Sequence, residues 1–277
     1  MTEAIVLIVN ADDFGLARGV NLGVAEACDR GILRSASLLA GGAFAEDAAR
    51  VALERPALGV GIHLALTQVR PVLPPSKIPA LMSGRDLFPA GPREIVARLI
   101  GGKIPQSEIL AEFSAQMDKA LDLGLRITHL DSHQHLHLLP KVRDAFMEIA
   151  RKYKIAKMRL PRLGGPVRSY GEWLKAVAIA AHSRLYARTF DGMIYSGKFW
   201  GLAASGDMNR ERLLSILRAL GPGTHELMTH PAAFDQSMHD SWHWDYHWED
   251  ELSALTDPNV LALVKSRSIT LANFIDL

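Results

Sequence analysis

Residues 5–15, Ile-Val-Leu-Ile-Val-Asn-Ala-Asp-Asp-Phe-Gly, combine a short apolar run with two adjacent carboxylates. Residues 5–10 predict a buried strand, because short β-branched runs are typical of parallel sheets covered on both faces. Asp12 and Asp13 follow at its carboxyl end, where α/β barrels place their active sites. Adjacent side chains of an extended chain point in different directions, so we expect the two carboxylates to do different jobs. The alternative is that one caps the following helix and the other is solvated.

The same alternation of apolar runs and helical patterns continues along the chain and predicts repeated βα units. Further strands are expected at 36–39, 60–66, 127–131, 157–160, 226–229 and 269–274, with a weak one at 193–195 or 198–199. Helices are expected at 21–30, 45–54, 93–100, 106–123, 141–153, 173–189, 209–220, 249–255 and 259–266. Residues 67–92 are rich in Pro and Gly and too long for an ordinary connection, so they predict either a functional loop or an excursion over a site.

This arrangement favours a single domain over residues 1–277, built as a distorted TIM-like (β/α) barrel. We expect seven to eight parallel strands. An open dinucleotide-binding sheet is less favoured, since no Gly-x-Gly-x-x-Gly turn follows the first strand.

Composition excludes several classes of protein. The chain has 277 residues, a net charge of +1 and 48% hydrophobic residues, which is typical of a globular protein and gives no basic stripe for a nucleic acid. Its single cysteine, Cys28, rules out an intramolecular disulfide and any multi-cysteine zinc motif. The first apolar run is too short for a signal peptide or a membrane span, so we expect a cytoplasmic protein without a transmembrane segment.

Histidines cluster in a pattern that indicates a metal. In residues 128–137, Thr-His-Leu-Asp-Ser-His-Gln-His-Leu-His, five ionisable side chains alternate with other residues: His129, Asp131, His133, His135 and His137. An extended chain would place all five on one face. Burying five such groups is costly unless a metal, mutual hydrogen bonds or a polar cavity stabilises them. We therefore predict a metal site, with a purely structural polar network as the alternative.

Two further histidines end predicted strands. His63 interrupts the apolar run 60–66, and His230 precedes Pro231 at the end of strand 226–229. One Asp and two His from three strands would satisfy a mononuclear hydrolytic site, which needs three protein ligands and open positions for water and substrate. His230 suits proton donation to a leaving group, because the ordinary pKa of histidine lies near neutrality. The remaining histidines, with Asp131, would orient the ligands or contact substrate.

In this order, residues 11–15, 61–63, 128–137 and 230–231 closely resemble the motifs of the YdjC-like family of carbohydrate deacetylases, also called the ChbG/HpnK family. The resemblance covers essentially the whole chain. It implies a distorted barrel and metal-dependent removal of N-acetyl groups from amino sugars. It also implies that Asp13, His63 and His133 are metal ligands, that Asp12 is the base, and that His230 is the acid or a transition-state contact.

The resemblance leaves the substrate between two classes. Residues 69–75, 81, 86–88 and 199–206 resemble the hopanoid-associated branch, thought to deacetylate an N-acetylglucosaminyl hopanoid. Asp131-Ser132-His133 instead resembles the members that act on chitooligosaccharides. Both readings keep an acetylated amino sugar as substrate. One divalent ion is expected: two imidazoles favour zinc by ligand softness, whereas magnesium is often assigned in the family.

Other readings of the same residues stay open. A metal-dependent glycosidase or phosphoesterase is less favoured, because adjacent Asp residues are poorly placed to flank a glycosidic bond and phosphoesterases more often show two metals. A noncatalytic sugar-binding protein is the alternative outside enzymes. The aromatic segment 234–248 suits a wall of a sugar cleft, a packed surface loop or a subunit contact. A homo-oligomer and a transient membrane-surface contact also remain open.

Overall fold

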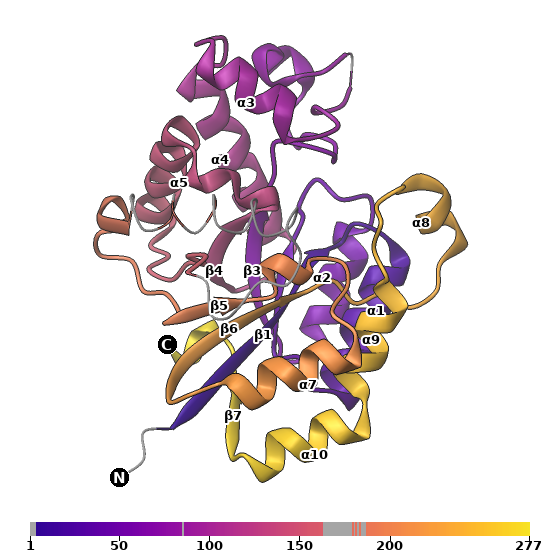
Figure 1. Cartoon of the computed structure of the whole chain (residues 1–277). Coiled ribbons are helices and arrows are strands. Elements are labelled where there is room, and N and C mark those ends of the chain that lie inside the picture. The colour runs from indigo at the N-terminus through magenta and orange to yellow at the C-terminus, as the bar shows by residue number, and fades with distance from the viewer. Residues whose placement is uncertain (1–3, 85, 163–178, 180, 182, 184–186) are drawn as a thin grey trace.

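A computed structural model describes residues 4–84, 86–162, 179, 181, 183 and 187–277 of the chain. Its centre is one curled parallel sheet with helices outside it (Figure 1). The strands run in the order β4-β3-β2-β1-β6-β5, and β7 pairs with β1. The strands are β1 (Ile5–Phe14), β2 (Ser35–Leu38), β3 (Gly59–Leu64), β4 (Ile127–Ser132), β5 (Lys198–Trp200), β6 (Gly223–Thr229) and β7 (Ile269–Ala272). The predicted α/β architecture with a curled, barrel-like parallel sheet is therefore confirmed.

Strand β1 organises the sheet. One of its edges pairs with β6 from Ile5 to Ala11. Its other edge is shared, because β7 pairs with the first half of β1 and β2 pairs with the second half. Every residue from Leu7 to Phe14 is buried. The carboxyl end of β1 is thereby held on both sides.

Amphipathic helices cover the outside of the sheet (Figure 1). In Figure 1, α3, α4 and α5 form one group, and α4 packs on both β3 and α5. On the other side, α1 contacts α2 and α9, and α7 contacts α9 and α10. The helices are α1 (Arg18–Arg30), α2 (Ala45–Leu53), α3 (Pro92–Ile100), α4 (Gln106–Asp122), α5 (Pro140–Tyr153), α7 (Arg210–Ala219), α8 (Gln236–Ser241), α9 (Trp248–Thr256) and α10 (Pro258–Ser266). No helix in the described part of the chain is both long and apolar enough to cross a bilayer.

Two predicted strands differ in the structure: the first strand and residues 157–160. Strand β1 continues to Phe14, so Asp12 and Asp13 belong to the strand itself. The weak strand lies at Lys198–Trp200, the second of the two predicted positions. Residues 157–160 form isolated bridges, Met158 with Leu130 and Lys157 with Ile194, instead of a regular strand. The helix predicted at 173–189 lies largely outside the described residues, and Ala187–Phe190 forms a 3-10 turn.

The expected alternation of five side chains on one face is wrong beyond His133. Strand β4 ends at Ser132, and His133–Leu138 folds into a 3-10 segment. Gln134 and His135 have left-handed backbone conformations, with φ of 56° and 55°. Extended backbone is lost there, so the period of two is lost with it. The His137 amide then turns back and donates to Ser132 Oγ at 2.9 Å.

The long connection after β3 is ordered by a buried carboxylate. Glu112 of α4 accepts hydrogen bonds from the amides of Val72 and Leu73 at 2.9 and 3.0 Å. Burial raises the pKa of Glu112, although these hydrogen bonds act to lower it. The loop is anchored through backbone groups that would otherwise lose their hydrogen bonds on burial. The anchored loop brings Gln68 and Pro92 to a cavity at the carboxyl ends of the strands.

Gly61 in β3 offers a test of this packing. An added Cβ would lie 2.3 Å from His129 Cε1, and the His129 ring cannot retreat easily because it stacks on Phe274 with centroids 3.7 Å apart. We expect Gly61→Ala to lower the free energy of unfolding by about 1–3 kcal/mol, the usual cost of overpacking. Urea denaturation measures it, with Gly221→Ala as the control because no atom lies within 4 Å of its Cβ position. Equal stability of the two variants would contradict the packing described.

Candidate active site

Asp12 and Asp13 converge on one histidine although they are neighbours in a strand. Asp13 has φ of 60°, and the pairing of β1 with β2 is irregular between Ala11 and Phe14. Asp12 Oδ2 lies 3.9 Å and Asp13 Oδ1 3.6 Å from His63 Nε2. Their main partners differ nevertheless: Arg159 for Asp12 and His133 for Asp13. A left-handed non-glycine residue is costly, and such residues concentrate at functional sites.

His63, the fifth residue of β3, is held by a carboxylate from the next strand. His63 Nδ1 donates to Asp131 Oδ1 at 2.8 Å, so Nε2 faces Asp12 and Asp13. Burial alone would lower the pKa of His63, but Asp131 and Asp12 raise it to about 9. A carboxylate on the far nitrogen is the usual support of a metal-binding imidazole, because it fixes the tautomer and the ring orientation.

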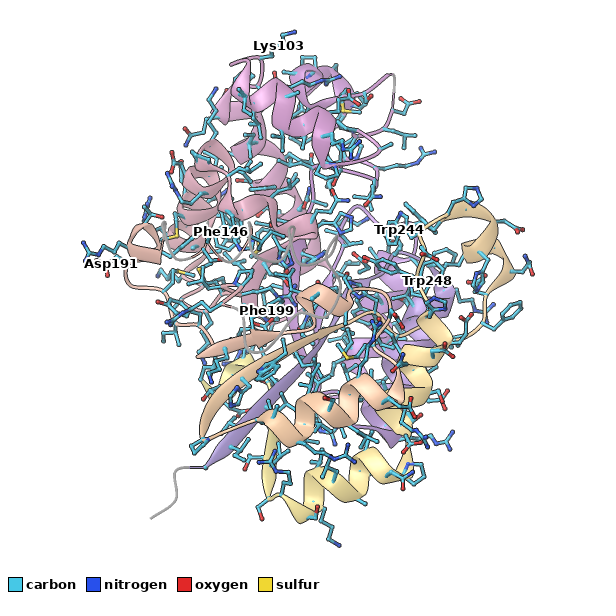
Figure 2. All side chains as sticks on the ribbon, viewed as in Figure 1. Lys103, Phe146, Asp191, Phe199, Trp244 and Trp248 are labelled. Atoms are coloured by element: carbon cyan, nitrogen blue, oxygen red, sulfur yellow. The ribbon has the colours of Figure 1, made fainter. Side chains whose placement is uncertain are left out.

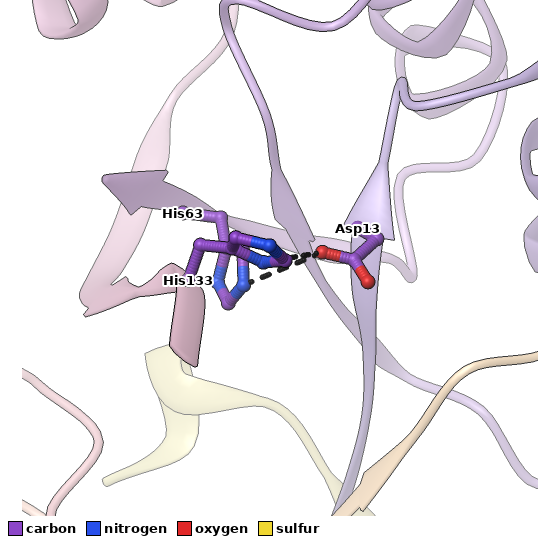
Figure 3. A group of neighbouring side chains, drawn as sticks. All are labelled: Asp13, His63 and His133. Carbon is purple, nitrogen blue, oxygen red and sulfur yellow. Dashed lines mark ion pairs between the residues drawn. The ribbon is translucent and has the colours of Figure 1, made fainter. Parts of the chain in front are cut away.

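His133 completes the group immediately after β4. Its Nδ1 lies 2.9 Å from Asp13 Oδ1, and its Nε2 lies 2.6 Å from Gln68 Oε1. Figure 3 shows the two imidazoles directed at the same oxygen of Asp13. One ligand atom from each of Asp13, His63 and His133 lies within 4.8 Å of the others, and all three residues are buried. The structure thus brings together the three residues expected as ligands.

These residues fit a divalent cation. Asp13 Oδ1 is buried and, despite its short distance to His133, makes no hydrogen bond of good geometry. Burial would raise the pKa of Asp13, but the imidazoles of His133 and His63 lower it below its ordinary value. A buried ionised carboxylate without a full set of partners is costly unless a cation lies beside it. One oxygen and two imidazole nitrogens form a donor set that first-row metal ions accept.

Arg159, which the sequence analysis missed, lies beneath this group and is fully buried. Its guanidinium holds Asp12 through two bonds of 2.6 and 2.7 Å and also contacts Asp131 at 3.0 Å and Glu226 at 2.6 Å. Burial would lower the pKa of Arg159, but Asp12 and Asp131 raise it, so its charge is fixed. The available signal was a cation between the apolar residues Met158 and Leu160 of the predicted strand 157–160. A charged residue there needs a buried counter-ion.

Of the other histidines in residues 129–137, only His135 lines the cavity. His129 Nε2 lies 3.2 Å from Ser37 Oγ, which also donates to Asp131 Oδ2 at 2.8 Å. His137 packs on Phe146 with ring centroids 5.1 Å apart, away from the cavity. Burial lowers the pKa of both His129 and His137 to about 3. His135 does line the cavity, and its Nδ1 is buried without a hydrogen-bond partner.

His230 also lines the cavity, directly after β6. Its amide donates to Glu251 Oε2 at 2.5 Å, and its ring lies 4.9 Å from that of Tyr246. His230 Nδ1 has no hydrogen-bond partner and lies 4.0 Å from Glu251 Oε1. Glu251 of α9 is a second residue that the sequence analysis missed. Burial raises its pKa, although the contact with His230 opposes this rise.

A cavity of about 700 Å³ opens above these groups. It has two aromatic walls from the segment 234–248, Trp244 and Tyr246, and Figure 2 shows Trp244 beside Trp248. The Trp244 ring stacks near His133 with centroids 6.0 Å apart. Part of the aromatic segment therefore forms a cavity wall, one of the roles that its sequence suggested. The lining consists of Asp12, Asp13, His63, Gln68, Pro92, His133, Gln134, His135, Ile179, Leu202, Ala203, Ser205, Met228, His230, Trp244 and Tyr246.

Known proteins are similar to this chain in sequence and in fold. The family model described as YdjC-like protein matches residues 6–266. The carbohydrate deacetylase of Thermoanaerobacter pseudethanolicus is 37% identical over 268 residues, which cover 97% of each chain. The chitooligosaccharide deacetylase of Enterobacter sp. (strain 638) is 32% identical and covers 98% of this chain and 99% of its own.

The fold has a solved counterpart. The crystal structure of a protein from Enterococcus faecalis V583 superposes with a TM-score of 0.80 at 25% identity, covering 99% of this chain and 98% of its own. The family match spans nearly every described element, from β1 to α10. Together with the full-length relatives, it shows that the chain belongs to the YdjC-like family.

Proposed function

We propose that the protein is a metal-dependent carbohydrate N-deacetylase, which hydrolyses the acetamide of an amino sugar to acetate and a free amine. The observation that carries this proposal is the convergence of Asp13, His63 and His133 on one buried point at a cavity with aromatic walls. The names of the full-length relatives, carbohydrate deacetylase and chitooligosaccharide deacetylase, support the same reaction.

Asp13, His63 and His133 would hold one divalent ion, zinc or magnesium. When bound, such an ion activates water for attack and polarises the acetamide carbonyl. Asp131 orients His63 for this task, because its Oδ1 accepts the Nδ1 proton and leaves Nε2 to face Asp13. The two proton transfers of the reaction are assigned to Asp12 and His230.

Asp12 is the proposed general base. Arg159 and Asn10 occupy three of the lone-pair directions of its two oxygens, with bonds of 2.6, 2.7 and 2.9 Å. An ionised carboxylate has about four such directions, so one stays available to accept a proton from the attacking water. The two bonds from Arg159 also keep the carboxylate from rotating. Asp12 lines the cavity, which gives it access to that water.

His230 is the proposed acid and follows β6, whereas His63 belongs to β3 and His133 follows β4. Its Nδ1 makes no hydrogen bond and lies 4.0 Å from Glu251 Oε1, so it would be available to pass a proton to the departing amine. Trp244 and Tyr246 offer ring faces with polar edges, which suit the apolar face of a pyranose. His135 would contact the sugar through its unpaired nitrogen.

The geometry weighs against a glycosidase. Asp12 and Asp13 both approach His63 Nε2, within 3.9 and 3.6 Å, and a glycosidase needs two carboxylates on opposite sides of the scissile bond.

The proposed deacetylation is tested directly by incubating metal-loaded protein with N-acetylglucosamine oligomers and, separately, with an N-acetylglucosaminyl lipid. Release of acetate and free amine from either substrate supports the proposal, and the two arms separate the substrate classes. Release from neither would overturn it.

The ligand assignment predicts the metal content of variants. Protein purified without chelator should hold roughly one divalent ion per chain, and its removal should abolish acetate release. Asp13→Asn should lower the occupancy strongly, because two imidazoles without an anionic ligand hold a divalent ion weakly. Elemental analysis measures the occupancy. Full activity in verified metal-free protein would refute metal dependence.

The variant Asp12→Asn distinguishes a general-base role of Asp12 from a role in binding the metal. The amide keeps the volume but cannot take the proton, so we expect turnover to fall by about 10²-fold or more while metal and substrate binding persist. Metal analysis and acetate release are measured on the same sample, with thermal unfolding as the check on folding. Metal loss equal to that of Asp13→Asn would mean that both carboxylates coordinate.

His230→Ala should keep the metal and lose turnover. A positioned acid contributes about 10²–10⁴-fold, and His230 belongs to a different strand end from the three proposed ligands. His239→Ala is the matched control, because this half-exposed histidine pairs with Glu249 outside the cavity. If His230→Ala also lost the ion, His230 would be reassigned as a ligand.

A further inference from the structure

Three polar side chains form a hydrogen-bonded chain that ends on the His133 ring. Thr67 Oγ1 donates to Gln134 Oε1 at 3.0 Å, and Gln134 Nε2 donates to Gln68 Oε1 at 2.9 Å. The same Gln68 oxygen lies 2.6 Å from His133 Nε2. In this arrangement the Gln134 side-chain amide accepts from the Thr67 hydroxyl with its oxygen and donates to the Gln68 oxygen with its nitrogen. Gln68 therefore presents its carbonyl oxygen to His133.

The contact with Gln68 decides which nitrogen of His133 is protonated and which is available to bind a metal ion. A carbonyl oxygen only accepts, so His133 Nε2 carries a proton and Nδ1 faces Asp13 Oδ1 at 2.9 Å. His63 has the opposite arrangement, with Nδ1 donating to Asp131 and Nε2 facing Asp13. The two imidazoles thus meet the same carboxylate oxygen through different nitrogens.

We propose that Gln68 is a positioning residue for the metal centre, which makes His133 bind the ion through Nδ1 while His63 binds it through Nε2. This inference rests on the proposed metal dependence and deepens it. Gln68 touches neither Asp13 nor His63 through a described hydrogen bond, so it acts on the centre only through His133.

The backbone around Gln68 supports a functional role. Gln68 has φ of 67°, inside a tight turn in which the Val69 amide donates to the Thr67 carbonyl at 2.8 Å. Such three-residue turns with positive φ are strained and rare. Its partner Gln134 is also left-handed, with φ of 56°. Gln68 contacts His133 directly and Gln134 reaches it through Gln68, and strain of this kind persists where surrounding contacts hold it.

The consequence is a link between the long loop 67–92 and the metal. The backbone amide of Gln68 donates to the carbonyl oxygen of Pro89 at 2.9 Å, so the two ends of the loop meet at this residue. A shift of the loop would move the Gln68 oxygen and release the His133 ring. Loss of the partner of a ligating histidine typically weakens metal affinity by about 10–100-fold.

The test compares three variants by calorimetric titration with Zn²⁺. Gln68→Leu removes the acceptor at similar volume and should weaken zinc binding by about 10–100-fold. Gln68→Glu keeps an acceptor oxygen and should retain most of the affinity. Gln236→Leu makes the same chemical change on the exposed helix α8 and should bind zinc like the unchanged protein.

A second readout identifies the nitrogens. In protein loaded with ¹¹³Cd and labelled with ¹⁵N, we expect cadmium coupling to Nδ1 of His133 and to Nε2 of His63. Coupling to Nε2 of His133, or unchanged zinc affinity in Gln68→Leu, would overturn the role of Gln68 while leaving the metal centre in place. An unchanged protein that binds neither zinc nor cadmium would overturn the metal centre as well.

Discussion

The guanidinium of Arg159 is the constraint around which the inside of the sheet is arranged. It is fully buried and contacts carboxylates from three strands: Asp12 of β1, Asp131 of β4 and Glu226 of β6. Removing these charges from water is expensive and is offset only by mutual pairing in good geometry. Loss of Arg159 would leave three buried acids uncompensated. The carboxyl ends of β1 and β4 are drawn to one point because their acids share this cation.

The charges around Arg159 explain the division of labour among the site's carboxylates. Asp12 and Asp131 are paired with the guanidinium, and burial raises the pKa of Glu226 to about 7 although Arg159 opposes that rise. Asp13 has no bond to Arg159 among the described contacts and faces imidazoles instead. It is therefore the carboxylate for which a metal ion would be the natural partner. Adjacent residues of identical chemistry differ because one reaches the cation and the other does not.

Backbone strain gathers at the same place. Of the six non-glycine residues with positive φ in the described part of the chain, four line the cavity: Asp13, Gln68, Gln134 and His135. Each such conformation costs about 1–3 kcal/mol. The hydrogen bonds of Gln68 and Gln134 hold part of this strain in place. Rigid placement of the His133 ring follows, since its supports have little freedom of their own.

The sequence by itself determined the features that depend on neighbouring residues. Apolar runs of four to eight residues predicted most strands, and polar groups at their ends predicted a site at one edge of the sheet, where Asp13, His63 and His133 do meet. The period-two interpretation of residues 129–137 was wrong after His133, because two left-handed residues, Gln134 and His135, interrupt the strand and no local pattern announces them.

Tertiary structure alone decided the partners of those groups. Arg159 meets Asp12 across 147 positions, Gln68 meets His133 across 65, and the Glu251 carboxylate meets the His230 amide across 21. Which buried charge pairs with which, and which imidazole nitrogen stays free, depends on the curl of the sheet and the course of the loop 67–92. Pairing of buried polar groups is settled only when the strands pack, because until then water satisfies each group separately.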